Sequence, residues 1–371
     1  LPNVWGINLL HSPNEPELEE HLVDLFLRYG VKMVSASAYM RLSLAVVRYR
    51  ILGLYEDGDQ ISCAHQIFAK VSHPTVAKQF LEPPSTKDIQ KLLRIGAISE
   101  EQAKWASLVP MCDAITIEGD SGGHTDRRNP FALFPTIVSL RNQCVDKYRY
   151  PIFLGLAGGI GEPRAFRAAL SLGADYVVLG SVHQSTVEAG TSQIVKEMLS
   201  KAEIDQFSYG ISPDMFEQGS LVQVLGKGTM YAQRTQTLRN IYLQRSDLSE
   251  LTEKEQIRVE RIFGASIEEV WSETQAYWEK RDPRILSKAQ KDGKLKISLL
   301  FRWYLGLSSR WARQGDESRK KDFQIWSGPS MGAFNNWVRG TSLEKPENRF
   351  AVTVAHTILK QVMNLSGKSF F

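Results

Sequence analysis

Short apolar segments alternate with helical patterns over the first 200 residues, and this alternation limits the possible folds more than any other feature of the sequence. Six segments are continuous apolar runs, rich in β-branched or aromatic residues and bounded by Gly, Pro or Asp: 4–10, 31–36, 66–71, 113–118, 151–157 and 175–179. Continuous apolar strands are typical of a parallel sheet that is buried on both faces. Since parallel neighbours need crossover connections, the sequence predicts repeated βα units.

Helical patterns lie between these strands. Residues 15–29 carry apolar side chains at helical spacing and end at Gly30, a residue that commonly terminates helices. The segments 131–148 and 163–172 have the same pattern, and Pro163 suits the first turn of a helix. The first half therefore predicts an α/β fold, either a (β/α)8 barrel or a doubly wound sheet.

From about residue 202 onward the strand pattern fades. Helices are expected at 252–263, 266–279, 295–311 and 351–364. The polar segment 315–322 is expected to be a loop. At about 150 residues per domain, the chain suits two domains. We expect a barrel portion at 1–204 and a mainly helical, substrate-binding domain at 205–371.

Charge, hydropathy and cysteine content exclude several classes. The chain has 45 Lys and Arg against 41 Asp and Glu, too small an excess to indicate a nucleic-acid partner. Its longest uncharged apolar stretch, 150–161, is too short to cross a bilayer, so no membrane partner is expected. Zinc-ligand motifs are absent, so no metal is expected. Three dispersed cysteines, Cys63, Cys112 and Cys144, predict reduced, buried thiols in a cytoplasmic protein.

Two glycine turns in consecutive βα units predict a phosphate site. Gly158 and Gly159 follow the strand at 151–157, and Gly180 and Ser181 follow the next strand. Glycine lets the backbone approach a ligand closely, and the N-terminus of a helix favours an anion. Phosphate sites in the loops after consecutive strands recur in (β/α)8 barrels. The alternative is two ordinary βα turns.

A second glycine-rich loop presents His124 after the strand at 113–118. Catalytic residues of barrels lie at this end of the strands, where an imidazole can donate or accept a proton. A structural histidine is the alternative. The same loop contains Gly119-Asp-Ser121-Gly-Gly123, a match to the nucleophile motif of serine hydrolases, but no helix pattern follows Ser121 as that motif requires.

Asn8 and Lys70 are further candidates at strand ends. Asn8 could bond the edge of a ring or form an Asx turn before Ser12 and Pro13. Lys70 lies in an apolar run, where its charge needs a partner such as an anionic flavin ring, unless its ammonium reaches solvent.

The second half contains an aromatic-rich set and a basic set. The aromatic residues are expected to form helical core rather than a cofactor site: Phe301, Trp303, Tyr304, Trp311, Trp326 and Trp337. The basic set forms either a solvated face or a surface for an acidic partner: Arg310, Arg313, Arg319, Lys320 and Lys321.

Several of these motifs resemble a known superfamily. Glu118-Gly-Asp-Ser-Gly-Gly-His124, Ala157-Gly-Gly-Ile160 and Gly180-Ser181 resemble the FMN-dependent nitronate monooxygenases and enoyl-acyl-carrier-protein reductases. Lys227-Gly-Thr-Met230 and Gly328-Pro-Ser-Met-Gly-Ala-Phe-Asn335 narrow the likeness. They resemble the PfaD type, the trans-acting enoyl reductases of polyketide and polyunsaturated fatty-acid synthases.

The resemblance implies an FMN-binding (β/α)8 barrel and a role for each motif. Gly158, Gly159, Gly180 and Ser181 would hold the FMN phosphate. Asn8 and Lys70 would contact the ring, and His124 would face it. The adjoining motif residues are expected to line the same cofactor site: Glu118, Gly122, Gly123 and Ala157.

The chain departs from the family in one respect. Family members carry two barrel strands before the one that matches 4–10, and only six strands are predicted here. Because the sequence starts without Met and almost within a strand, either upstream residues precede it or the barrel is incomplete.

The resemblance implies an enoyl reductase in which NADPH reduces FMN and hydride then passes to the β-carbon of an enoyl thioester on an acyl carrier protein. His124 or water would protonate the α-carbon. A homodimer is compatible with this expectation. The alternatives are a nitronate-type flavin oxidase, a serine hydrolase that uses Ser121, and a non-catalytic scaffold.

Overall fold

The computed structural model describes residues 5–11 and 15–366, and the chain forms two compact units. Unit 1 comprises Leu1–Asp120, Asp126–Ile160 and Ala165–Val178, and unit 2 comprises the remainder: Ser121–Thr125, Gly161–Arg164 and Leu179–Phe371. The units therefore interleave along the chain. The expected division into a barrel portion at 1–204 and a helical domain at 205–371 stays a prediction.

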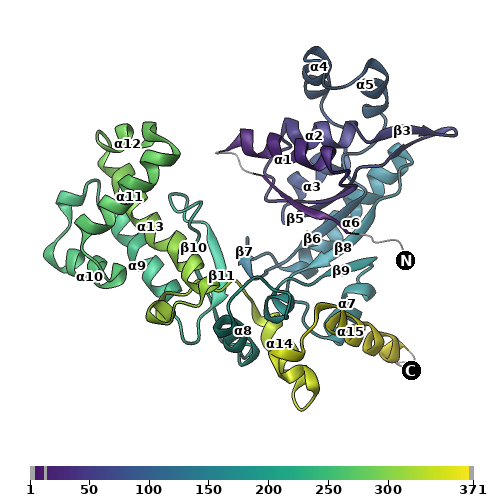
Figure 1. Cartoon of the computed structure of the whole chain (residues 1–371). Coiled ribbons are helices and arrows are strands. Elements are labelled where there is room, and N and C mark those ends of the chain that lie inside the picture. Colours follow the sequence, from purple (N-terminus) through teal and green to yellow (C-terminus); the bar gives the residue numbers. More distant parts are fainter. Residues whose placement is uncertain (1–4, 12–14, 367–371) are drawn as a thin grey trace. The chain divides into compact units, whose positions relative to one another are not determined.

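A parallel sheet of six strands forms the centre of unit 1 (Figure 1). Its strands, in spatial order, are β1 (Ile7–Leu10), β2 (Met33–Ser37), β5 (Gln66–Val71), β6 (Ala114–Glu118), β8 (Phe153–Ala157) and β9 (Tyr176–Val178). All six predicted strands are confirmed, although Val4 lies outside the described residues. Spatial order follows chain order without reversal, as in the wall of a (β/α)8 barrel, whereas a doubly wound sheet reverses at its midpoint.

Helices connect these strands as the sequence predicts. The expected helices are α1 (Pro16–Arg28), α6 (Pro130–Tyr148) and α7 (Pro163–Ser171). Further elements of unit 1 were not expected: α2 (Leu44–Ile51), the hairpin of β3 (Leu54–Asp57) and β4 (Gln60–Cys63), α3 (Pro74–Leu81), α4 (Thr86–Arg94) and α5 (Glu100–Ala106). Of the three free thiols, Cys112 and Cys144 are buried as expected, but Cys63 is only partly buried.

Unit 2 contains strands that the sequence pattern did not reveal. Its antiparallel sheet has the order β10 (Phe207–Ile211), β11 (Leu221–Leu225), β7 (Gly123–His124). The strands are short, and short apolar runs in a sequence rich in helices do not distinguish a strand from a helix. The segment expected to be a loop at 315–322 instead contains a 3-10 helix, η3 (Glu317–Asp322), and its last residue, Asp322, is buried.

Helices make up most of unit 2. They are α8 (Gln193–Ser200), α9 (Tyr231–Gln244), α10 (Glu253–Phe263), α11 (Ile267–Arg281), α12 (Pro283–Ala289), α13 (Gly293–Gln314), α14 (Pro329–Val338) and α15 (Ala351–Ser366), with the 3-10 helices η1 (Ser181–Ser185), η2 (Leu248–Glu250), η4 (Ser342–Glu344) and η5 (Pro346–Asn348). Phe263, Phe301 and Tyr304 are buried in a core shared by α9, α10, α11 and α13. None of the helices in the described part of the chain has the length and apolar composition needed to span a bilayer.

A buried ion pair connects three elements of unit 1. The Arg50 guanidinium is 1% exposed and lies 2.6 Å from Asp113 Oδ2. Asp113 also accepts the backbone N–H of Ile67 at 2.7 Å and the hydroxyl of Tyr150 at 2.6 Å. This carboxylate therefore bonds α2, β5 and the segment before β8 from its own position next to β6.

We predict that Asp113→Asn lowers the free energy of unfolding by about 3 kcal/mol, because it leaves a buried guanidinium without a counter-charge. Urea unfolding followed by circular dichroism measures this loss. The matched control is Asp24→Asn, which breaks the more exposed pair with Arg48 and should cost less than about 1 kcal/mol. Equal losses in the two variants would contradict the importance of the Asp113 network.

Candidate functional site

The candidate residues of unit 1 lie at one edge of its sheet. The strands are parallel, so their carboxyl ends meet there, and Asn8, Lys70, Glu118 and Ala157 lie at or near these ends. Ligand sites of parallel α/β sheets form at this edge.

Lys70 and Glu118 form an ion pair across neighbouring strands. Lys70 is the register partner of Thr116, and its Nζ lies 2.9 Å from Glu118 Oε1. The two side chains are 30% and 18% exposed. The sequence left the partner of Lys70 open, and the structure identifies a carboxylate on β6. The ammonium is therefore held in one position at the edge of the sheet.

Asn8 is also anchored to a neighbouring strand. Its Oδ1 accepts the hydroxyl of Ser37 at 2.7 Å, and the residue itself is exposed. This bond orients the side-chain amide while leaving its nitrogen available as a donor. The alternative Asx turn involves Ser12 and Pro13, which lie outside the described residues.

The turn after β8 contains two glycines with different roles. Gly158 has a φ of +87°, and an added Cβ would lie 2.7 Å from the carbonyl oxygen of Asp120. Gly159 has a φ of +74°, but an added Cβ there would meet no atom within 4 Å. Gly158 is thus required by packing against the end of β6, whereas Gly159 lines open space that a ligand can enter.

The second predicted phosphate turn follows β9. This strand neighbours β8, with Ala157 opposite Val178, and Gly180 comes two residues later. An added Cβ at Gly180 would meet no atom within 4 Å. Ser181 begins η1, and its Oγ accepts the backbone N–H of Gly328 at 3.1 Å. The two glycine turns therefore leave adjacent strands at their carboxyl ends.

The paired glycines before His124 are required for two different reasons, a close contact at Gly122 and a positive φ at Gly123. An added Cβ at Gly122 would lie 2.6 Å from Ser181 Oγ and 2.7 Å from the backbone of Ser327. Gly123 has a φ of +89° and lies against the Trp326 ring. Glycine at 122 lets the backbone pass close to its neighbours, and glycine at 123 adopts the positive φ without strain.

His124 is held in a polar cluster. Its Nε2 lies 2.8 Å from Ser212 Oγ and 2.9 Å from Asp214 Oδ1, and its ring meets the Trp326 ring edge-on at 5.1 Å between centroids. A carboxylate can only accept, so Nε2 carries the proton in the bond to Asp214. Nδ1 is then the nitrogen available to a reacting group, and the 40% exposure of the side chain permits access.

The carboxylate beside His124 is charged at neutral pH. Burial alone would raise the pKa of Asp214, but the hydrogen bond and charge of His124, together with the bond from Ser212, lower that pKa to about 2. This charged carboxylate accepts from Nε2 and so fixes the orientation of the ring. The cluster is therefore suited to presenting the imidazole of His124 for proton transfer.

The geometry does not support a serine hydrolase. In a Ser–His–Asp triad the serine and the aspartate contact opposite ring nitrogens, whereas Ser212 and Asp214 contact the same nitrogen of His124. Ser121 is followed by β7 rather than by the helix that a nucleophile elbow requires.

Three contacts of His124 were not predicted from the sequence. Ser212 and Asp214 follow β10, a strand that the pattern did not indicate, and Trp326 was assigned to the helical core. Instead Trp326 is 38% exposed and forms a bridge with Val224 beside β7. Recognition of β10 would have placed Ser212 and Asp214 at a strand end, where functional residues are common.

The two glycines after β8 should differ in their tolerance of a side chain. Both substitutions require a positive φ, which costs about 1 kcal/mol or more for a residue other than glycine. Gly158→Ala also creates a backbone clash, so its unfolding free energy should fall by about 2 to 3 kcal/mol. Gly159→Ala should cost only about half as much. Urea denaturation measures both, and a Gly159→Ala loss as large as that of Gly158→Ala would contradict this assignment.

Family profiles match both halves of the chain. The profile described as "Nitronate monooxygenase" matches residues 55–219. The profile described as "[Acyl-carrier-protein] S-malonyltransferase, inserted helical domain" matches residues 246–323, the segment of α10 to α13 and η3. The first profile contains Lys70, Glu118, His124 and the glycine turns.

Curated relatives match nearly all of this chain. Polyketide biosynthesis protein PksE of Bacillus subtilis is 40% identical over 362 residues, which cover 96% of this chain and 47% of PksE. A polypeptide of the polyunsaturated fatty acid synthase of Thraustochytrium is 42% identical over 348 residues, which cover 92% of this chain and 23% of that polypeptide. The chain thus spans less than half of the length of either relative.

Solved structures agree with this relationship. The enoyl reductase domain of MlnA, from the macrolactin biosynthesis cluster of Bacillus amyloliquefaciens, is 37% identical with a TM-score of 0.93, covering 98% of this chain and 83% of that domain. FabK from Thermotoga maritima has a TM-score of 0.54 at 16% identity, over 99% of this chain and 78% of FabK, and shows the shared fold alone. Motifs, fold and relatives agree, and the chain belongs to the PfaD-type enoyl reductases of polyketide and polyunsaturated fatty-acid synthases.

Proposed function

We propose that the protein uses a flavin and NADPH to reduce the α,β double bond of an enoyl thioester carried by an acyl carrier protein. Family membership supports the flavin and the reductase chemistry. The observation within the chain that carries the proposal is the His124 imidazole bonded to the Asp214 carboxylate. A reduction of this kind needs one hydride and one proton, and this cluster is built to supply the proton.

The residues of both glycine turns fit a bound flavin mononucleotide. Gly159 and Gly180 border open space, which a phosphate needs in order to approach the backbone. Gly158, Gly159, Gly180 and Ser181 would hold the phosphate, and Asn8 and Lys70 would contact the ring. The motif residues beside them would line the same site: Glu118, Gly122, Gly123 and Ala157. When bound, FMN would supply the redox chemistry, taking hydride from NADPH and passing it to the β-carbon of the substrate.

His124 would supply the proton. The ring is fixed through Nε2 by Ser212 and Asp214, and its other nitrogen would protonate the α-carbon as the double bond is reduced. Because the side chain is 40% exposed, solvent can return the proton afterwards. The Lys70 ammonium, held by Glu118, would present a positive charge at the edge of the sheet of unit 1.

The partner follows from the relatives and from the second family profile. The relatives named above belong to polyketide and polyunsaturated fatty-acid synthesis, and the helical segment matches a domain of an enzyme that acts on an acyl carrier protein. These matches support a carrier-bound substrate rather than a free acid.

A nitronate oxidase that uses O₂ is the second candidate, because residues 55–219 match the nitronate monooxygenase profile. The two functions differ in the electron acceptor, which is the enoyl thioester for the reductase and O₂ for the oxidase. Consumption of NADPH that requires an enoyl thioester supports the reductase. Oxygen uptake with an alkyl nitronate, without NADPH, supports the oxidase.

The full-length protein should be yellow and bind FMN. We expect anaerobic NADPH to bleach the flavin absorbance and a crotonyl thioester on a carrier protein to restore it, with one butyryl product formed per NADPH consumed. Absorbance spectroscopy with mass spectrometry of the carrier protein measures both. A folded protein that stays colourless after addition of FMN would sink the proposal.

Removal of the Asp214 charge should slow turnover. Without this carboxylate the ring of His124 loses the acceptor that fixes it through Nε2, so proton transfer from the ring becomes less efficient. We expect Asp214→Asn to lower kcat by about tenfold, against a loss of about 10²-fold or more for His124→Ala. Steady-state kinetics with the carrier-bound substrate measure both.

Two variants control for indirect effects at Asp214. Asp214→Glu keeps the carboxylate and should restore much of the lost kcat. Asp205→Asn removes an exposed carboxylate of unit 2 that does not belong to the cluster and should leave kcat unchanged. If Asp214→Asn kept the wild-type kcat, the carboxylate would have no part in proton donation.

A further inference from the structure

A basic cavity lies on unit 2, and none of its lining residues belongs to the His124 cluster. It has a volume of about 570 Å³ and brings together three parts of the chain: Gly228 and Arg234, the end of α10 at Arg261 and Ile262, and all of η3. Five of the lining side chains are basic and two are acidic: Arg234, Arg261, Arg319, Lys320 and Lys321, against Glu317 and Asp322.

Two of the five cations form ion pairs with Asp322. This carboxylate is 4% exposed, forms ion pairs with Arg234 and Arg319, and also accepts the hydroxyl of Tyr304 at 2.8 Å. By contrast Arg261, Lys320 and Lys321 are exposed, and none of the three forms an ion pair with a carboxylate in the part of the chain that the structure describes. With five basic side chains against two acidic ones, the cavity lining has a net excess of three positive charges.

The backbone that carries these three cations is held rigidly. The Arg319 guanidinium lies 4.0 Å from the centre of the Trp311 ring and donates to the carbonyl of Phe263 at 2.6 Å, which ties η3 to the end of α10. The N–H of Met230 donates to the carbonyl of Lys321 at 2.7 Å. Phe323, directly after η3, is fully buried. These segments are thus already ordered without a partner. Binding therefore costs little conformational entropy.

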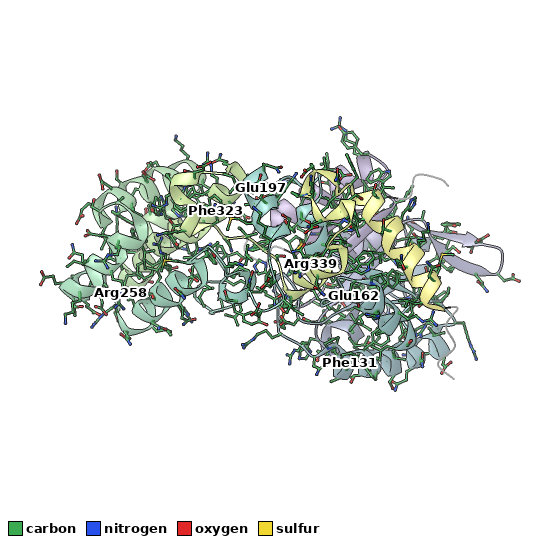
Figure 2. The ribbon with its side chains drawn as sticks, turned by 90° about the horizontal axis from the view of Figure 1, so that it is seen from below. Phe131, Glu162, Glu197, Arg258, Phe323 and Arg339 are labelled. Carbon is green, nitrogen blue, oxygen red and sulfur yellow. The ribbon has the colours of Figure 1, made fainter. Side chains whose placement is uncertain are left out.

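Apolar side chains adjoin the basic ones. Ile257 is 50% exposed and precedes Arg261 by one turn of α10, so the two share a helix face. Met230 is 39% exposed beside Lys321. Figure 2 shows α10 at the outside of the helical region, with Arg258 projecting from it. Exposed apolar groups among charges are typical of a protein-binding surface, whereas a site for a free anion needs none.

The sequence grouped a different set of basic residues. Arg310 and Arg313 lie on α13 and do not line this cavity. Arg319 stacks on the Trp311 ring and forms an ion pair with Asp322. Only Lys320 and Lys321 of that set remain available, and Arg261 joins them from α10. We call Arg261, Lys320, Lys321, Ile257 and Met230 the basic face.

We propose that the basic face docks the acidic surface of the acyl carrier protein that delivers the substrate. This inference rests on the proposed function, which names a carrier protein as partner. Three like charges around one cavity repel one another, and carboxylates of a partner relieve that repulsion. The charges also accelerate encounter with an acidic protein and make binding sensitive to salt.

The test compares three substrates that carry the same enoyl group. The crotonyl carrier protein offers a protein surface, and crotonyl coenzyme A offers phosphates without a protein surface. Crotonyl N-acetylcysteamine offers neither a protein surface nor phosphates. In Arg261→Glu/Lys320→Glu/Lys321→Glu the KM for the carrier substrate should rise about tenfold or more, while kcat stays unchanged. The KM for the N-acetylcysteamine thioester should not change, and that for the coenzyme A thioester should rise less than twofold.

A matched variant controls for overall charge. Lys280→Glu/Lys288→Glu/Lys291→Glu makes the same change of charge on exposed positions of α11, α12 and the turn after α12, and should leave the carrier KM unchanged. Raising the salt concentration should increase the carrier KM of the wild type but not that of the basic-face variant. An equal effect of both triple variants would overturn the proposal, as would an unchanged carrier KM.

Two further outcomes separate this inference from the proposed function. An equal rise of KM for the carrier and coenzyme A substrates would assign the face to phosphate and overturn carrier docking. If none of the thioesters is reduced by the wild type, the proposed function fails, and fluorescence anisotropy of a labelled carrier protein still tests docking directly. Lys320→Ala/Lys321→Ala, a milder change, replaces the triple variant in each assay if circular dichroism shows that the triple variant is unfolded.

Discussion

One buried carboxylate aligns the strands on which the candidate site of unit 1 depends. Asp113 bonds Arg50 of α2, the N–H of Ile67 on β5 and the hydroxyl of Tyr150 before β8. These bonds fix the amino ends of neighbouring parallel strands. Since register is maintained along a strand, the same alignment places Lys70 opposite Thr116 at the other end and brings its ammonium to Glu118. An ion pair at one end of the sheet thus positions the candidate pair of Lys70 and Glu118 at the other.

The glycines of the site separate into two kinds by what surrounds them. Gly122 and Gly158 have neighbours so close that a side chain would clash, and they let the backbone pass in contact with Ser181 and Asp120. Gly159 and Gly180 face open space. The first kind sets the shape of the loops, and the second kind leaves the backbone accessible to a phosphate. Both are needed if a loop is to be rigid and also able to bind closely.

Unit 2 contains both the imidazole cluster and the basic face, and each uses an aspartate differently. Asp214 is partly exposed and accepts a hydrogen bond from His124, which lowers the pKa of the Asp214 carboxyl. Asp322 is buried and forms ion pairs with Arg234 and Arg319, so that these arginines shape the cavity rather than attract a partner. The side-chain charges of Arg261, Lys320 and Lys321 form no ion pair in the described part of the chain and so remain available to a partner. This division of charge supports a partner surface separate from the chemistry.

The sequence by itself determined the six parallel strands, most of the helices, the two glycine turns and the position of His124 at a strand end, because apolar periodicity and glycine act over a few residues. The capping box of Ser99 and Gln102 was a local signal for α5 that was overlooked. Only the tertiary structure decided the partners of these residues. His124 meets Asp214 across 90 positions of the chain, Lys70 meets Glu118 across 48, and Arg261 shares a cavity with Lys320. No local pattern encodes such contacts, since they depend on how distant segments pack and on which charges are left without a partner.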